Sequence, residues 1–159
     1  MGLLERPDEG LISIEGVENP RHNKKLQIQR DLFGYIFQNY ALIENETVES
    51  NLRISLDYRK GIDKKEEISK ALSYVGLDGI TKKKIYELSG GEQQRVALAR
   101  VYLKKCTYIF ADEPTGNLDK KNRDIVLDIL KSLNSEGKAI IYATHDVELA
   151  SKADKTFVV

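Results

Sequence analysis

The feature that most constrains the fold is the alternation of short apolar runs with helical patterns in the last third of the chain. Tyr108–Ala111 and Ala139–Ala143 are continuous apolar runs of strand length. Between them, apolar residues recur at the helical period after a candidate cap, Asp119: Val126, Ile129, Leu130 and Leu133. Apolar strands separated by helices are typical of a parallel sheet covered by helices on both faces. The sequence therefore predicts an α/β fold.

Further strands are predicted outside this third. Leu11–Ile14 alternates weakly, and Phe33–Phe37 is an aromatic-rich run that ends at the polar Gln38. The last residues, Thr156–Val159, predict a final strand.

Three helices are predicted in addition to the one that follows Asp119. The first has apolar residues at the helical period and stops at Gly76: Ile68, Ala71, Leu72 and Val75. The second runs from Gly90 to Lys104, where Ser89 and Glu92 form a capping box. A short third helix is predicted over 147–151.

Charge and composition exclude several functional classes. The 159 residues contain 25 Lys and Arg against 25 Asp and Glu, so no net field attracts the chain to nucleic acid or to an acidic membrane surface. A single cysteine, Cys106, excludes an internal disulfide framework and is interpreted as a packed thiol. The apolar runs are too short to span a bilayer, so a role at a membrane requires another chain.

The sharpest motif is the string Leu-Ser-Gly-Gly-Glu-Gln-Gln-Arg over 88–95. Two glycines at a helix start allow close approach of a ligand, and the free N–H groups there form an anion site. Ser89 can cap the helix and also offer its hydroxyl to a phosphate oxygen. An ordinary capped helix would also carry Ser-x-x-Glu, so this interpretation depends on the whole string.

Three further polar signals follow apolar strands. Asp112 and Glu113 end the run that starts at Tyr108, His145 follows the run 139–144, and Gln38 follows Phe37. The carboxyl ends of parallel strands are where open α/β sheets bind ligands. Each signal is weak alone, because acids, a histidine or a glutamine often follow strands for no functional reason.

Together, in this order and spacing, the segments resemble the ABC ATPase family. Its signature motif is similar to the string over 88–95, and its Walker B segment is similar to the run 108–113. The residues Pro-Thr-Gly-Asn-Leu-Asp over 114–119 resemble the family's D-loop. The resemblance implies a P-loop NTPase core, with ATP and Mg²⁺ as ligands.

The resemblance implies roles for four of these residues. Asp112 would hold magnesium, usually through water, and Gln38 would contact magnesium and water. Glu113 would polarise the attacking water as general base. His145 would contact the γ-phosphate and orient that glutamate.

It also implies a head-to-tail homodimer. Each nucleotide would lie between the phosphate loop of one subunit and Ser89, Gly90 and Gly91 of the other, and the interface would have two-fold symmetry. Gln93 and Asp119 are assigned to the same nucleotide-binding set.

The layout indicates a transporter subunit. The stretch over 39–88 leaves room for a compact helical subdomain within a single partial domain, 1–159, and not for a long coiled coil. Tyr86-Glu87 and the form of the D-loop are most similar to the bacterial export and lipoprotein-release branch. The resemblance implies a cytoplasmic ATPase subunit, peripheral on the inner face of the cell membrane, with a transmembrane permease as partner.

The phosphate-cradling pattern Gly-x-x-x-x-Gly-Lys-Ser/Thr does not occur in the sequence. The only Gly-Lys pair, Gly137-Lys138, is followed by Ala139, and Ser132 occupies the position of the first glycine. We therefore expect that the Walker A strand, loop and helix precede Met1, and that the chain is cut at both ends. The 159 residues alone are predicted neither to bind ATP appreciably nor to hydrolyse it, and to self-associate through exposed sheet surface.

Two other interpretations remain open. One is a soluble ABC ATPase of translation or DNA repair, and the other is a non-catalytic fragment that only self-associates or binds a partner.

Overall fold

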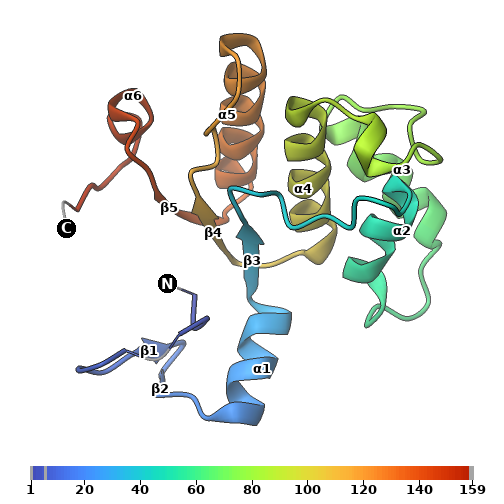
Figure 1. Cartoon of the computed structure of the whole chain (residues 1–159). Coiled ribbons are helices and arrows are strands. Elements are labelled where there is room, and N and C mark those ends of the chain that lie inside the picture. The colour runs from blue at the N-terminus through green and yellow to red at the C-terminus, as the bar shows by residue number, and fades with distance from the viewer. Residues whose placement is uncertain (1, 6, 158–159) are drawn as a thin grey trace.

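The computed structural model describes residues 2–5 and 7–157, and its centre is a three-stranded parallel sheet (Figure 1). The strands are β3 (Phe33–Ile36), β4 (Tyr108–Asp112) and β5 (Ala139–Ala143), in the order β3-β4-β5. Phe33 pairs with Tyr108, and Tyr108 pairs with Ala139, so the three strands start together and end at one edge. The predicted α/β class with a parallel sheet is confirmed.

The other elements are six α-helices, two short 3₁₀ helices and a small hairpin within the described residues. The α-helices are α1 (His22–Asp31), α2 (Val48–Arg53), α3 (Lys64–Tyr74), α4 (Gly90–Lys104), α5 (Lys120–Ser135) and α6 (Val147–Ala150). The 3₁₀ helices are η1 (Ile54–Leu56) and η2 (Ile85–Glu87), and the antiparallel hairpin is β1 (Ser13–Ile14) with β2 (Val17–Glu18). No helix in the described part of the chain is long and apolar enough to cross a bilayer.

Both long helices begin at the caps that the sequence predicts. At α4 the Ser89 hydroxyl accepts a hydrogen bond from Glu92 N at 3.3 Å, while Glu92 Oε2 accepts one from Ser89 N at 2.8 Å. At α5 the Asp119 carboxylate accepts from Asn122 N at 2.8 Å. These caps satisfy N–H groups that have no partner within the helix.

One face of the sheet packs against α4 and α5, which lie side by side (Figure 1). Four consecutive α4 residues, Val96 to Ala99, have no exposed surface. Three of these, Val96, Leu98 and Ala99, share a core cluster with Ile36, Ile109 and Ala111 of the sheet. On the other side of α4, helices α2 and α3 extend the same core, with Leu52 and Leu72 fully enclosed.

The opposite face of the sheet carries aromatic side chains and is only partly covered. Phe33 is buried against Leu3 and Ile28, whereas Tyr35, Tyr108 and Phe110 are half-buried. A hollow of about 480 Å³ lies over this face, lined partly by Phe33, Tyr108 and Phe110. Helices α4 and α5 therefore cover one face as predicted, whereas on the other face α1 covers only part of the sheet, through Ile28 against Phe33.

Several predicted boundaries differ from the structure. The strand predicted at Leu11–Ile14 shortens to a two-residue arm of a hairpin, and α1 falls in a polar stretch for which no helix was predicted. Of the predicted final strand, Thr156 and Phe157 lie outside any strand, while 158–159 lie outside the described residues. Phe157 is 84% exposed, so no burial holds it to the sheet.

Candidate active site

The candidate site begins where β4 ends. Asp112 is the last residue of β4, paired with Ala143 of β5, and its side chain is exposed. Glu113 then leaves the strand with a left-handed backbone, φ 43°, while its N–H still donates to Ala143 O at 2.9 Å. A positive φ is uncommon for a residue with a side chain and is often found at functional sites. This turn directs the Glu113 side chain to the end of β5.

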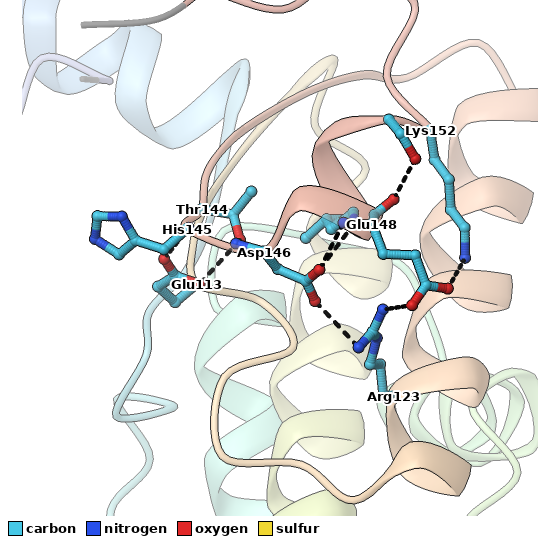
Figure 2. Close-up of polar contacts among 9 residues, drawn as sticks. Glu113, Arg123, Thr144, His145, Asp146, Glu148 and Lys152 are labelled. Atoms are coloured by element: carbon cyan, nitrogen blue, oxygen red, sulfur yellow. Dashed lines mark hydrogen bonds and ion pairs between the residues drawn. The ribbon is translucent and has the colours of Figure 1, made fainter.

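The Glu113 carboxylate is held by the two residues that follow β5 (Figure 2). Glu113 Oε1 accepts from the backbone N–H of His145 at 2.6 Å, and Oε2 accepts from the Thr144 hydroxyl at 3.0 Å. The structure thus brings Asp112, Glu113 and His145 to one edge of the sheet. The contact uses the His145 backbone, because the exposed imidazole projects away from Glu113 and the neighbouring ion pairs (Figure 2).

Gln38 lies beside the same turn. A β-carbon added to Gly116 would lie 3.3 Å from Glu113 Cβ and 3.9 Å from Gln38 Nε2. The Gly116 N–H donates to Glu113 O at 2.9 Å, which closes the turn. The structure therefore places the amide of Gln38 next to the segment that carries Glu113.

The loop that follows Gln38 is anchored by Arg100 of α4. Tyr40 and Ala41 both have left-handed backbones, with φ 62° and 47°. The Arg100 guanidinium donates to their carbonyl oxygens, at 2.9 Å to Tyr40 and 2.5 Å to Ala41. Burial lowers the pKa of Arg100 from its ordinary value, although an arginine stays charged at any ordinary pH. This half-buried cation holds two successive strained residues in place.

The starts of α4 and α5 form a second group of predicted residues. A β-carbon on Gly91 would come within 2.3 Å of Asn122 Cγ, so glycine is required for the two helix starts to approach this closely. Arg95 Nη1 donates to Asn122 Oδ1 at 2.9 Å and links the helices. Asp119, the α5 cap, accepts from the Asn122 side chain as well as its N–H, and these bonds lower the pKa of Asp119.

Three polar side chains of the signature string, those of Ser89, Glu92 and Gln93, form hydrogen bonds within the chain. The Ser89 hydroxyl donates to Glu92 Oε2 at 2.8 Å. Hydrogen bonds from the Ser89 N–H and hydroxyl lower the pKa of Glu92. Gln93 Nε2 donates to the carbonyls of Ile85 and Leu88, at 3.2 and 3.1 Å. Ser89 and Gln93 thus shape the turn before α4, where Gly90 is exposed and Gly91 is buried against Asn122.

Sequence reasoning missed two residues that connect these groups. Thr144 holds Glu113, and the fully buried Gln94 donates from Nε2 to Pro114 O at 2.6 Å, tying α4 to the turn after Glu113. The polarity of Gln94 within an otherwise apolar helix face was a signal that could have found it. Thr144 carried no signal of its own, because its contact depends on how β4 pairs with β5.

The donor set at the sheet edge fits magnesium carried by a phosphate ligand. No group of three or more His, Cys, Asp or Glu side chains in the described part of the chain could form a metal cage. Asp112 supplies one exposed carboxylate, without a side-chain hydrogen bond to the described residues, and Gln38 supplies an amide nearby. Magnesium is commonly bound by one or two carboxylates, phosphate oxygens and waters.

Comparisons with known proteins identify the family of the chain. The profile of the family described as ABC transporter matches residues 2–116. The lipoprotein-releasing system ATP-binding protein LolD of Aquifex aeolicus is 41% identical over 98% of this chain, which spans 71% of that protein. The macrolide export ATP-binding/permease protein MacB of Chlorobium phaeobacteroides is 38% identical over 99% of this chain, which spans only 24% of that protein.

Solved structures give the same result at the level of the fold. The ATP-binding cassette MJ0796, solved as a dimer in a post-hydrolysis state with ADP and Pi, superposes with a TM-score of 0.83 at 32% identity. That match covers 94% of this chain and 68% of the cassette. By sequence and by fold, the chain belongs to the ABC transporter family and has the α/β architecture of its ATP-binding cassettes.

Proposed function

We propose that these 159 residues form the hydrolytic part of an ABC transporter ATPase that couples ATP hydrolysis to export. The observation that carries this proposal is the arrangement at Glu113, whose strained backbone and two hydrogen bonds aim one carboxylate at the edge where Asp112 and Gln38 also lie. The similarity to LolD and MacB supports export as the process.

Each residue of the sheet edge has a distinct part in the proposal. Asp112 and Gln38 would hold Mg²⁺, which neutralises phosphate charge when bound. Glu113 orients the attacking water and accepts its proton. To reach that water, its carboxylate exchanges at least one of the bonds from Thr144 and His145 N. The exposed His145 imidazole is free to swing toward the γ-phosphate.

The start of α4 acts on the nucleotide of a second subunit. The exposed backbone of Gly90 at the helix start would form an anion-binding edge, and Gly91, Ser89, Gln93 and Asp119 would form its surroundings. The dimeric state of the MJ0796 cassette supports a homodimer of this kind. A transmembrane permease would be the partner, with the ATPase on the inner face of the membrane.

A phosphate-cradling loop has to come from outside the 159-residue sequence. Backbone N–H groups and a lysine of such a loop supply much of the electrostatic stabilisation in phosphoryl transfer. We expect calorimetry to detect no tight MgATP binding by the 159 residues alone. Tight binding would contradict this part of the proposal.

The test joins a strand-loop-helix segment carrying Gly-x-x-x-x-Gly-Lys-Ser/Thr ahead of Gly2 and measures ATPase rates. Glu113→Gln is expected to lower kcat by roughly 100-fold or more, because the amide cannot accept a proton. Glu44→Gln is the matched control, since Glu44 is exposed and bonds to the rest of the chain through its backbone. Equal rates for the Glu113 and Glu44 variants would refute the assignment.

The half-covered aromatic face supports a second behaviour, self-association of the 159 residues. Apolar sheet surface and strand edges that lack a neighbour favour pairing between copies. Light scattering is expected to find oligomers that disappear when the strand-loop-helix segment is joined. A monomer without the segment would contradict this expectation.

A further inference from the structure

Arg123 lies in the first turn of α5 and reaches across to the segment that follows His145 (Figure 2). Its Nη1 pairs with Asp146 Oδ2 at 3.3 Å, and its Nη2 pairs with the Glu148 carboxylate. The Arg123 side chain is 23% exposed, and its Nε is buried with no hydrogen-bond partner among the described residues. This guanidinium is thus drawn into the protein to bridge two carboxylates.

Asp146 is the point at which this pairing meets the candidate site. Its Oδ1 accepts from the N–H groups of Glu148 and Leu149, at 2.9 and 3.2 Å, which fixes the start of α6. Its own N–H donates to the Thr144 hydroxyl oxygen at 3.0 Å. That hydroxyl in turn donates to Glu113 Oε2 at 3.0 Å. A continuous chain of polar contacts therefore runs from Arg123 to the Glu113 carboxylate.

We propose that Arg123 is a positioning residue that sets the orientation of Glu113 and His145. It does so by fixing Asp146, and through Asp146 the hydroxyl of Thr144 and the backbone N–H of His145. The importance of this orientation for hydrolysis rests on the proposed function. The positioning itself is a property of the fold and can be measured without nucleotide.

The location of Arg123 also makes it a link to the start of α5. Asp119 is the N-cap residue of α5, and its carbonyl oxygen accepts a hydrogen bond from the Arg123 N–H at 2.9 Å. A displacement of the Asp119 loop by a second subunit would move the base of Arg123. Because the guanidinium holds Asp146, that displacement reaches Thr144 and Glu113. Arg123 thus couples the proposed dimer-facing loop to the proposed general base.

The planar guanidinium suits this task better than an ammonium group. Two separate nitrogens of Arg123 engage Asp146 and Glu148, whereas a lysine offers one compact charge at the end of a flexible chain. The pair between Arg53 and Glu49 provides a contrast, because it lies within one helix with side chains 52% and 32% exposed. Arg53 is therefore a matched control, because its ion pair stays within α2.

The test measures hydrogen exchange of individual backbone amides in the 159-residue protein. Arg123→Met is expected to raise the exchange rate of the His145 and Asp146 amides by roughly tenfold, as local opening becomes easier. Arg123→Lys should give an intermediate rate, and Arg53→Met should leave both amides unchanged. Amides of Ala97 and Ala99 in the α4 core report global unfolding and should keep their rates in every variant.

Two outcomes would overturn the inference. One is an unchanged rate at His145 in Arg123→Met, and the other is an equal rise at Ala97, which would mean a general loss of stability. In the protein joined to a phosphate loop, Arg123→Met should lower kcat roughly tenfold with little change in KM, since misplacing a catalytic group slows the chemical step. If Glu113→Gln left the ATPase rate unchanged, the proposed function would fail while the exchange result would still decide the positioning role.

Discussion

The two faces of the parallel sheet differ in what covers them. The face toward α4 meets an apolar core in which Ile36, Ile109 and Leu98 have at most 1% exposure. The face formed by Tyr35, Tyr108 and Phe110 packs mainly against residues 2–5, the β1–β2 hairpin and α1, and remains half-exposed over its hollow. The chain therefore completes its core on one side of the sheet and leaves the other side open.

This difference matters for the candidate site, which lies at the shared edge of both faces. The segments that carry Glu113 and His145 are anchored from the α4 and α5 side. Gln94 bonds to Pro114, and Arg123 pairs with Asp146. Burial and polar anchoring on that side can fix Glu113 without help from the aromatic face. The comparison predicts that substitutions on the two faces have unequal effects on stability.

The largest effect is expected for Ile109→Ala. Ile109 has 0% exposure on the α4 face of the central strand, and removing a buried isoleucine side chain costs about 4 kcal/mol through lost burial and a residual cavity. Urea denaturation with a fixed m-value measures the change. A loss below about 1 kcal/mol would show that the α4 face is less tightly packed than its burial indicates.

A smaller loss is expected for Gly34→Ala. Its β-carbon would lie 2.7 Å from Cys106 Sγ and 2.9 Å from Val101 Cγ1, so the α4 face would have to shift at a cost of about 2.5 kcal/mol. Urea midpoints of Gly34→Ala, measured with Cys106 present and with Cys106→Ala, test whether the clash with the sulfur causes the loss of stability. Removing the sulfur should recover part of the lost free energy of unfolding. Equal losses with and without Cys106 would show that the added methyl group clashes with another residue.

Phe110→Ala probes the aromatic face of β4, because Phe110 directly follows Ile109 in that strand. Phe110 packs against Phe33 with ring centroids 4.9 Å apart but is only half-buried. We expect a loss of about 2 kcal/mol, roughly half that of a fully buried phenylalanine. Urea denaturation beside Ile109→Ala gives the direct comparison. A larger loss for Phe110→Ala would reverse the ranking of the two faces.

The smallest effect concerns the outer boundary of the closed core, where Tyr74 of α3 donates to Glu136 at 2.9 Å. Burial, followed by the bond to Glu136, raises the pKa of Tyr74 from 10.0 to about 12. Because the native state keeps the proton longer, this contribution to stability is present below pH 10.0 and is lost as the pH rises toward 12.

Tyr74→Phe should therefore flatten the decline in stability over this pH window. Urea midpoints at both ends of the window measure the decline. Tyr58→Phe is the control, because Tyr58 is 78% exposed. A decline of the same size in Tyr74→Phe and in the unsubstituted protein would contradict the pKa shift of Tyr74.

The sequence predicted those elements in which a capping residue or an apolar pattern coincides with the residues that the structure buries. Helix α4 follows from a capping box at Ser89 and a periodic apolar face, and β5 follows from an apolar run bounded by Gly137 and His145. Helix α1 was missed because only Ile28 of its ten residues is buried, which leaves no apolar period to detect. The strand predicted to start at Thr156 was wrong for the described residues, since an apolar sequence alone does not supply a neighbouring strand.

At the candidate site, residue types were predictable and contacts were not. Asp112, Glu113 and His145 stand out because they follow apolar strands, and the structure brings these strand ends together. The hydroxyl of Thr144 meets Glu113 only because β4 and β5 pair in one register, with Asp112 opposite Ala143. The Arg123 pairing likewise depends on how α5 lies beside α6, which no local pattern records.

The most direct test of a triphosphate site at this sheet edge is paramagnetic broadening of amide signals by Mn²⁺ and ATP. The protein joined to a phosphate loop is titrated with Mn²⁺ in place of Mg²⁺, with and without ATP. We predict that signals from 38, 112–116 and 145 broaden first and only when ATP is present, while those of α3 persist. Broadening centred on α3 or on the aromatic face, or the same broadening without ATP, would contradict the account.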